Sequence, residues 1–282
     1  MFEKLHSILH KQSTSFQVLS DLHLEINQQY LSYEIPLRSK HLILAGDVGR
    51  LVDYDNYRSF LQKQTDRFEL VFLVLGNHEF YNDTFAAGLQ RARQLEQEPS
   101  LNGRLILLHR GRYDIPSSGV TILGCTLWSK VPGEAVDIVR LIIQDFKQIQ
   151  DWIVDDHSRS HEADLSWLLG EIESIRSGRG DAAQSTSTKR SIVVVTHHAP
   201  SLRRTSSPQH ANNPWSSAFG TDVLPQLSKS SGVKVWVFGH THYTTEFKNR
   251  GIRVTANQRG YVLSGNSGEP KDGFDVGKVI HV

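Results

Sequence analysis

Five short segments of the chain place histidine, aspartate or asparagine directly after a run of apolar residues. Imidazole nitrogens and carboxylate or amide oxygens together suit Mn, Fe, Zn or Ni more than Ca or Mg. The chain holds 14 histidines and one cysteine, so a metal site would be built from imidazole and carboxylate rather than thiolate. The five segments are 18–25, 42–50, 72–80, 193–200 and 237–242.

The spacing within these segments predicts that their side chains converge. Asp21 and His23 lie two residues apart, as do His240 and His242. On an extended segment both members of such a pair project from one face, so both can reach one ion. Ligands in open α/β sheets bind beyond the carboxyl ends of strands. In three segments a glycine, which permits a sharp turn or a close backbone approach, precedes the ligand; these are Gly46, Gly76 and Gly239.

The surrounding sequence indicates an α/β fold. Short runs that are apolar throughout predict strands covered on both faces, at 16–19, 42–45, 70–75, 105–108, 120–123, 192–196 and 233–238, with weaker signals at 252–256 and 260–264. Apolar residues at three- and four-residue spacing predict helices at 57–67, 83–98, 136–152 and 162–176. Early strand–helix–strand alternation is typical of covered sheets. The polar stretch at about 177–190 is expected to be a surface loop within one domain spanning 1–282.

The five segments resemble those of the calcineurin-like metallophosphoesterase superfamily. That family's pattern is D-x-H, G-D, G-N-H-[DE], a histidine with a nearby proline, and G-H-x-H. All five occur here in the family's order, from Asp21 to His242. The resemblance implies a four-layer sandwich of two facing mixed β-sheets flanked by helices, with a dinuclear metal site at one edge.

The resemblance also implies a role for each matching residue. His78 would not be a ligand; it would face the phosphate and stabilise developing charge or protonate the leaving oxygen. A water or hydroxide between the two metals would be the nucleophile, because paired ions lower the pKa of water and clamp phosphoryl oxygens. The implied ligands are Asp21, His23 and His242 for one ion, Asn77, His197 and His240 for the other, and Asp47 bridging both.

One segment departs from the pattern of the protein phosphatases. Those enzymes extend G-D to G-D-x-x-D-R, where the second aspartate orients the catalytic histidine. Here Asp47 is followed by Val48, Gly49 and Arg50, and Asp53 lies too far along to match. The departure favours a small phosphomonoester or a phosphodiester, such as a cyclic nucleotide, over a phosphorylated protein as the substrate.

Several residues near the motifs carry more than one interpretation. Arg50 is expected either to contact phosphate or to form a salt bridge or cap. His198 is expected either to face the substrate or support a ligand, or to be a structural histidine. Tyr81 and Trp128 either line the pocket or belong to the core. Glu25 and Glu79 are expected to be structural, or to accept hydrogen bonds that orient ligands.

Residues outside the motifs support further expectations. The sole cysteine, Cys125, is expected to be a buried hydrophobe. The long segment 201–221 and the helix at 136–152 are candidates for substrate selection. His157, His161 and His210 have no motif around them and are expected to be exposed to solvent.

Bulk composition bears on partners and location. Lysine plus arginine number 31 and aspartate plus glutamate 30, a formal net charge of +1 that does not suggest nucleic-acid or membrane attraction. The polar N-terminus and single cysteine predict a cytoplasmic protein. The competing functions are a nuclease or protein phosphatase of the same fold, hydrolysis of a non-phosphate ester or amide by the same metals, and a non-enzymatic scaffold that binds a protein partner. The substrate, the metal and the oligomeric state stay open.

Overall fold

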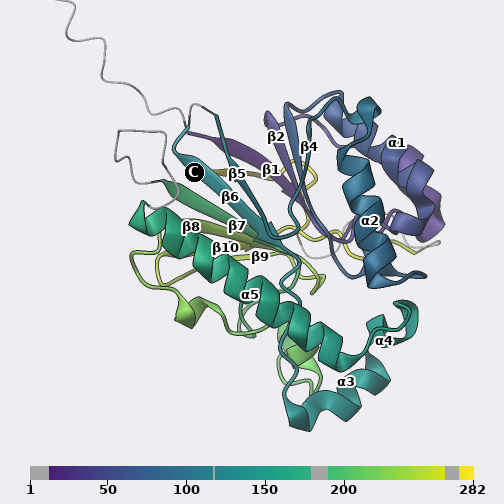
Figure 1. Cartoon of the computed structure of the whole chain (residues 1–282), viewed down its shortest axis with the longest axis vertical. Coiled ribbons are helices and arrows are strands. Elements are labelled where there is room, and N and C mark those ends of the chain that lie inside the picture. Colours follow the sequence, from purple (N-terminus) through teal and green to yellow (C-terminus); the bar gives the residue numbers. More distant parts are fainter. Residues whose placement is uncertain (1–12, 117, 179–189, 264–272) are drawn as a thin grey trace, which may run out of the picture.

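The computed structural model describes residues 13–116, 118–178, 190–263 and 273–282, and within them the chain forms two β-sheets packed face to face (Figure 1). The first sheet has the order β11-β1-β2-β3-β4 and the second β5-β6-β7-β8-β10-β9. The strands of the first sheet are β1 (Ser15–Leu19), β2 (His41–Ala45), β3 (Leu70–Val74), β4 (Leu105–Leu107) and β11 (Val279–His281). Those of the second are β5 (Gly111–Asp114), β6 (Val120–Cys125), β7 (Ser191–Thr196), β8 (Val233–Phe238), β9 (Thr245–Asn249) and β10 (Ile252–Ala256).

Each sheet is mixed in the way that the family resemblance implies. β1 to β4 run parallel to one another, while β11 pairs antiparallel with β1. In the second sheet β6, β7, β8 and β10 are parallel, and the edge strands β5 and β9 pair antiparallel. The carboxyl ends of β1, β2 and β3 therefore share one edge of the first sheet, and those of β7 and β8 share one edge of the second.

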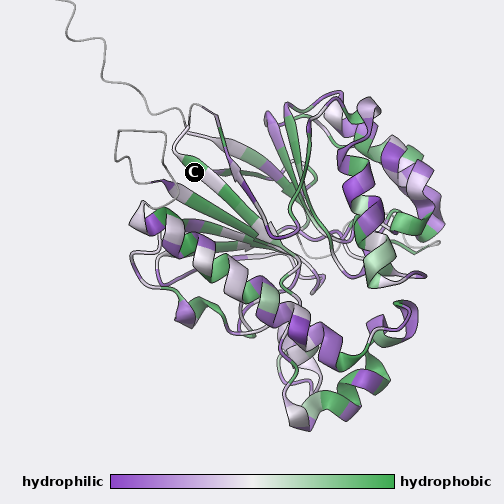
Figure 2. Cartoon of the chain, in the orientation of Figure 1, coloured by the Kyte–Doolittle hydropathy of each residue, from purple (hydrophilic) through white to green (hydrophobic). Residues whose placement is uncertain are grey.

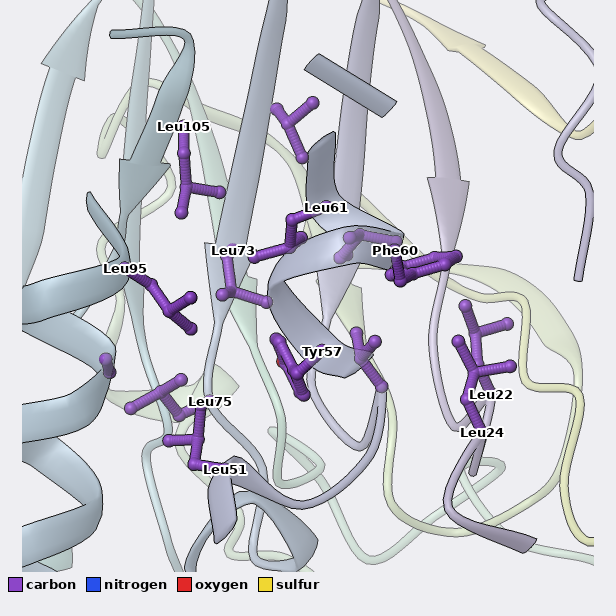
Figure 3. Close-up of a cluster of buried hydrophobic side chains, with 14 of the residues drawn as sticks. Leu22, Leu24, Leu51, Tyr57, Phe60, Leu61, Leu73, Leu75, Leu95 and Leu105 are labelled. Atoms are coloured by element: carbon purple, nitrogen blue, oxygen red, sulfur yellow. The ribbon is translucent and has the colours of Figure 1, made fainter. Parts of the chain in front are cut away.

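Period-2 alternation along the strands builds separate cores on the two faces of each sheet. Leu42 and Leu44 of β2 pack beneath the helices, whereas Ile43 and Ala45 join the core between the sheets. The outer face of the first sheet is covered by α1 (Tyr54–Thr65) and α2 (Phe85–Glu96). Figure 3 shows this cluster, with Tyr57, Phe60 and Leu61 of α1 beside Leu73.

The second sheet is covered by α5 (Val154–Ser177), whose Leu168 and Ile172 belong to one apolar cluster with residues of β6, β7 and β8. Figure 1 shows α5 crossing this sheet, while α3 (Val136–Ile142) and α4 (Asp145–Gln148) lie beyond its lower end. The four layers follow from strands that are apolar on both faces, since each face needs a cover. Cys125 is fully buried on β6, as expected.

Two expectations about helices were wrong. The helix at 136–152 is broken at Ile143, whose ψ of 131° is extended, and the chain re-enters a helix at Asp145. The helix at 162–176 begins earlier, at Val154. That earlier start places His157 and His161 on the same face as Leu168, so both are buried rather than exposed. His210 is exposed, as expected.

Sequence reasoning also missed the short edge strands β5, β9 and β11, which carry too few apolar residues to be recognised. The weak signal at 260–264 forms no strand over its described residues, 260–263. Residues 179–189, most of the expected surface loop, lie outside the described residues. None of the helices in the described part of the chain has the length and apolarity needed to cross a bilayer.

Candidate metal centre and active site

Strand ends from both sheets bring the five sequence segments together. The His197 ring Nδ1, just after β7, donates to the Ala45 carbonyl at the end of β2 over 2.9 Å. The backbone N–H of His240, just after β8, donates to Asp21 Oδ1 over 2.9 Å. These two bonds join one sheet to the other at the shared edge, where the parallel strands end.

The local backbone of this edge differs from the extended conformation expected from the spacing. Asp21 and His23 both have positive φ angles, 53° and 47°. Their N–H groups bond to the carbonyls of Gly46 and Asp47, each over 3.0 Å, which holds the unusual turn in place. The same left-handed backbone recurs in Asp47, His240 and His242, with φ from 50° to 72°. Asp and His tolerate this region better than most residues, so the side chains converge through tight turns rather than along an extended strand.

Glycines make room for these turns, as predicted. Gly46 has a φ of +88°, and a Cβ there would collide with the His197 ring. A Cβ on Gly76 would collide with the Asp47 carboxylate. Any side chain at either position would therefore push a predicted ligand out of place.

The first group of ligand atoms gathers around Asp21, His23, Asp47 and His242. The His23 Nε2 and His242 Nε2 atoms face one another at 2.9 Å. His23 Nε2 lies 3.8 Å from Asp47 Oδ2, and His242 Nε2 lies 3.5 Å from Asp21 Oδ1. His23 Nδ1 contacts Glu25 Oε1 at 3.3 Å, which directs Nε2 toward the group.

The second group gathers around Asp47, His197 and His240, with Asn77 beside them. His197 Nε2 lies 3.0 Å from Asn77 Oδ1 and 3.4 Å from Asp47 Oδ2. His197 Nδ1 donates to a carbonyl, which turns Nε2 toward the group, where it would offer its lone pair to a metal on losing its proton. Asp47 belongs to both groups, as a bridging ligand must.

The donor set of both groups fits a pair of cations. Asp21 is fully buried, and its Oδ2 has no hydrogen-bond partner, which is costly for a carboxylate unless a cation faces it. Burial alone would lower the pKa of His197, yet the Asp47 carboxylate raises it to about 10. The buried carboxylates thus strongly favour positive charge at this point.

His78 stands beside the ligands without belonging to either group. Its ring Nδ1 lies 2.8 Å from Glu25 Oε1 and its Nε2 lies 3.1 Å from the Tyr261 hydroxyl. Its ring stacks on Tyr81 with centroids 4.1 Å apart. Burial opposes its protonation, but Asp47 and then Glu25 raise the pKa of His78 to about 9. The ring is therefore held as a proton donor facing the cavity.

Glu25 contacts His78, the residue that the family resemblance implies would face the phosphate. Burial works against its ionisation, but hydrogen bonds from His23 and His78 lower the pKa of Glu25 to about 2. A carboxylate four residues after Asp21 thus contacts His78 in place of one after Asp47. Sequence reasoning proposed an orienting role for Glu25 but left its partner undetermined, because the segment itself does not contain His78.

Glu79 ties two ligand segments together. Its Oε2 accepts from the backbone N–H groups of Asp47 (3.0 Å) and Gly76 (2.7 Å). Its Oε1 accepts from the N–H of Val48 (2.8 Å) and the Tyr57 hydroxyl (3.0 Å). Burial, followed by Asp47, raises the pKa of Glu79 to about 7. The residue fixes the backbone that carries the ligands and does not face the cavity.

Replacing Glu79 with glutamine is expected to lower the free energy of unfolding by about 1–3 kcal/mol. In the variant, the glutamine NH₂ would face backbone N–H groups that in the parent protein donate to the Glu79 carboxylate, and the loss of these bonds is destabilising. A neutral side chain is easier to bury, which offsets part of the destabilisation. Urea unfolding measures the change. Glu69→Gln is the control, since Glu69 pairs with Lys40 on the surface and its loss should leave the free energy of unfolding nearly unchanged. Equal effects in the two variants would contradict the assignment.

Asp145 was missed by sequence reasoning because it follows the break between α3 and α4. Its Oδ1 accepts from Asn77 Nδ2 and from the Tyr81 hydroxyl, each over 2.7 Å. The contact fixes the Asn77 amide with its oxygen toward His197. Asp145 is buried, and burial raises its pKa. The only sequence signal was its position in a segment proposed as a pocket wall.

Asp145→Ala is expected to weaken metal binding by about 10–100-fold, because the Asn77 amide loses the acceptor that sets its orientation. The loss should fall on the site that contains Asn77 and His197. Titration of the chelator-treated protein with Mn or Zn, followed calorimetrically, measures it. Tyr81→Phe removes a hydroxyl that donates to Asp145 and accepts from Asn77 Nδ2 over 3.1 Å, but it leaves the shorter bond from Asn77 to the Asp145 carboxylate and should cost less. An unchanged metal affinity in Asp145→Ala would reject the positioning role.

Of the remaining sequence candidates, Tyr81 lines the cavity but Arg50 and His198 do not. Arg50 pairs with Asp53 at 3.1 Å, which is the salt-bridge alternative. The His198 ring is fully buried, with centroids 4.1 Å from His240 and 5.3 Å from Trp128. Trp128 itself is core. His198 thus backs a predicted ligand rather than facing a substrate.

A family model described as calcineurin-like phosphoesterase matches residues 14–244, which include every segment of this site. The chain belongs to this family. Uncharacterized protein L509 of Acanthamoeba polyphaga mimivirus is 25% identical over 294 residues, covering 93% of this chain and 96% of that protein.

Solved structures share the family fold. Phosphopantetheinyl hydrolase (PptH) from Mycobacterium tuberculosis superposes with a TM-score of 0.62 at 18% identity, covering 89% of this chain and 91% of that one. GAP50, the anchor in the inner membrane complex of Plasmodium, gives a TM-score of 0.51 at 12% identity, covering 92% and 75%. These likenesses confirm the fold of the family: two mixed sheets flanked by helices.

In this member of the family the two groups of proposed ligands border a cavity of about 470 Å³. Asp47, Asn77, His78, His240 and His242 form its inner end. Its outer walls come from the two segments proposed from sequence, the end of α3 and the stretch from Ala199 to Gly220. The cavity is of a size that holds a small organic ligand.

Proposed function

We propose that this protein is a dinuclear metal-dependent hydrolase of small phosphoesters. Family membership supports metal-dependent phosphoester hydrolysis, and the buried His and Asp clusters can hold metal ions. The observation that carries the finer proposal is the pair of ligand groups sharing Asp47, with His78 beside them and outside both. The proposed ligands are Asp21, His23, Asp47 and His242 for one ion, and Asp47, Asn77, His197 and His240 for the other.

Two transition metal ions held by these residues would supply Lewis acidity for the activation of water and the polarisation of the phosphoryl oxygens. The chain's own residues position the proposed ligands and the proposed proton donor. Asp47 and Glu79 hold the ligand segments in register, and Asp145 fixes the Asn77 amide. His78, with Glu25 on its Nδ1, presents Nε2 to the cavity, where it donates a hydrogen bond or proton to the substrate's leaving oxygen.

The fold alone does not establish catalysis, since it also occurs in GAP50, a protein described as an anchor. The complete ligand set and the paired His78 favour an enzyme over a scaffold. A nuclease is disfavoured by the formal net charge of +1. The single cysteine, buried on β6, supports a cytoplasmic location as part of the proposal.

The test combines metal analysis with turnover. Purified protein is stripped with a chelator, reloaded separately with Mn, Fe, Zn or Ni, and assayed with p-nitrophenyl phosphate and bis-p-nitrophenyl phosphate. We expect about two ions per chain and metal-dependent release of p-nitrophenolate. Protein that binds no transition metal, or that binds two and releases nothing from either ester, would reject the proposal.

A further inference from the structure

A lobe outside the two sheets forms the outer half of the cavity. α3 and the segment from Ala199 to Gly220 share a small apolar cluster of their own, which includes Val139 and Ala218 and is distinct from the cores of the sheets. Figure 1 shows α3 and α4 beyond the ends of the strands, and Figure 2 shows that the α3 ribbon is mostly hydrophobic. The lobe therefore packs separately from the sheets and lies beside the edge that carries the proposed ligands.

This lobe presents apolar side chains to the cavity. Ile142 at the end of α3 stays 40% exposed although it lines the cavity, and Leu202 on the opposite wall is also 40% exposed. Trp215 and Phe219 line the cavity and also pack on the lobe's cluster. Polar lining in this half comes from neutral groups such as Ser201 and Asn213. Exposed apolar groups facing a cavity favour a ligand that covers them.

Positive side chains are absent from the same walls. Among the described residues that line the cavity there is no lysine or arginine. Three nearby guanidinium groups are committed elsewhere: Arg50 to Asp53, Arg204 over the Phe247 ring, and Arg259 to the Leu22 carbonyl. Arg203 is exposed and does not line the cavity. Proteins that bind extra phosphate charge usually supply arginine or lysine for it.

The charges behind the inner end are negative. Glu25 stands behind His78 and Asp145 behind Asn77, with Asp145 itself lining the cavity. Apart from bound metals, the described walls offer only imidazoles, His78 and the exposed His210 among them, and no permanent cation to balance a second negative charge on a substrate. A singly charged phosphodiester fits these walls better than a doubly charged phosphomonoester or a polyphosphate, whose extra charge would stay poorly compensated.

We propose that the substrate is a phosphodiester that carries an uncharged, partly apolar organic group, which lies against Ile142 and Trp215. The inference rests on the proposed function and narrows it from phosphoesters in general to one class. The phosphate occupies the metal end, and the lobe selects the group attached to it. The proposed metal site therefore recognises the charge of the phosphate at one end of the cavity, and the lobe recognises the attached apolar group at the other end.

Three esters that share the p-nitrophenolate leaving group test the proposal on the metal-loaded protein. They are bis-p-nitrophenyl phosphate, methyl p-nitrophenyl phosphate and p-nitrophenyl phosphate. We expect kcat/KM to be highest for the bis-aryl diester and lowest for the monoester. A monoester preferred over both diesters overturns the inference but leaves the proposed function standing, whereas no hydrolysis of any of the three overturns both.

Variants separate the lobe's contribution from the intrinsic reactivity of the esters. Ile142→Ser is expected to reduce the ratio of kcat/KM for the bis-aryl over the methyl diester by about 3–10-fold, and Trp215→Ala by about 10-fold or more. Leu141→Ser is the matched control, because Leu141 is 66% exposed and does not line the cavity. Since Trp215 also packs in the lobe, Ile142→Ser keeps the test informative if Trp215→Ala unfolds.

Binding to the metal-loaded His78→Ala protein, in which turnover is expected to be slow, gives a second readout. Diphenyl phosphate should bind more tightly than dimethyl phosphate in calorimetric titration, and Ile142→Ser should narrow that difference while Leu141→Ser leaves it unchanged. The same ratio of affinities in both variants and the parent protein would show that the lobe does not select the organic group, and would overturn the inference.

Discussion

Asp47→Asn is expected to reduce phosphoesterase kcat/KM by about 1,000-fold or more and to lower the bound metal below two ions per chain. Asp47 Oδ2 lies between the two groups, 3.4 Å from His197 Nε2 and 3.8 Å from His23 Nε2. His197, followed by His78, outweighs burial and holds the pKa of Asp47 well below its usual range, so the residue serves as a permanent anion between the sites. An amide offers one oxygen and no charge, and a thousandfold loss corresponds to about 4 kcal/mol of transition-state stabilisation.

Elemental analysis of the variant and steady-state kinetics at saturating metal measure the two effects separately. Asp53→Asn is a matched control, because Asp53 pairs with Arg50 away from the ligands. It should retain two ions and nearly full activity. Thermal unfolding verifies that the Asp47 variant is folded. A folded Asp47→Asn protein that keeps two ions and most of its activity would show that Asp47 is not the bridge.

His78→Ala is expected to lower kcat by about 100–10,000-fold while the two metal ions stay bound. His78 lies outside both ligand groups, so its loss should not release metal. The buried charge of Asp47 and Glu25 on Nδ1 together raise the pKa of His78 to about 9, which favours the protonated ring. The kinetic loss and the retained metal are the combined signature of a catalytic residue rather than a ligand.

The leaving group distinguishes proton donation from charge stabilisation by His78. If the ring protonates the leaving oxygen, the loss in His78→Ala should be much larger for an alkyl ester than for a p-nitrophenyl ester, because p-nitrophenolate leaves without a proton. Glu25→Gln should show the same dependence in weaker form, with metal content close to that of the parent protein. A loss independent of the leaving group would assign His78 to electrostatic stabilisation instead.

The sequence predicted that the five segments follow strands, because strand ends are local features. An apolar run followed by Asp, Asn or His is visible in a few consecutive residues, and the structure places the segments after β1, β2, β3, β7 and β8 at one edge. The family and its fold were predicted from the order of those segments, and both are confirmed. The roles of the individual ligands remain proposals that the variants above test.

The sequence described the conformation of the ligand segments wrongly. Two-residue spacing suggested extended pairs, yet Asp21 and His23 both adopt left-handed backbone. The bonds that impose this conformation come from Gly46 and Asp47 on another segment, so they are invisible in a local pattern. The same limit applied to His157 and His161, whose burial depended on where α5 begins and on what it packs against.

The sequence by itself determined the ligand types, their order along the chain and the absence of a second aspartate after Asp47. Only the tertiary structure decided that Glu25 contacts His78, that Asp145 holds the Asn77 amide, and that Arg50 turns away to Asp53. Glu25 lies 53 residues from His78 and Asp145 lies 68 residues from Asn77. A side chain that orients a catalytic group needs only one hydrogen bond to that group. A segment far away in the sequence can supply this bond once the sheets have packed. Spacing along the chain therefore indicates the proposed ligands but not the residues that orient them.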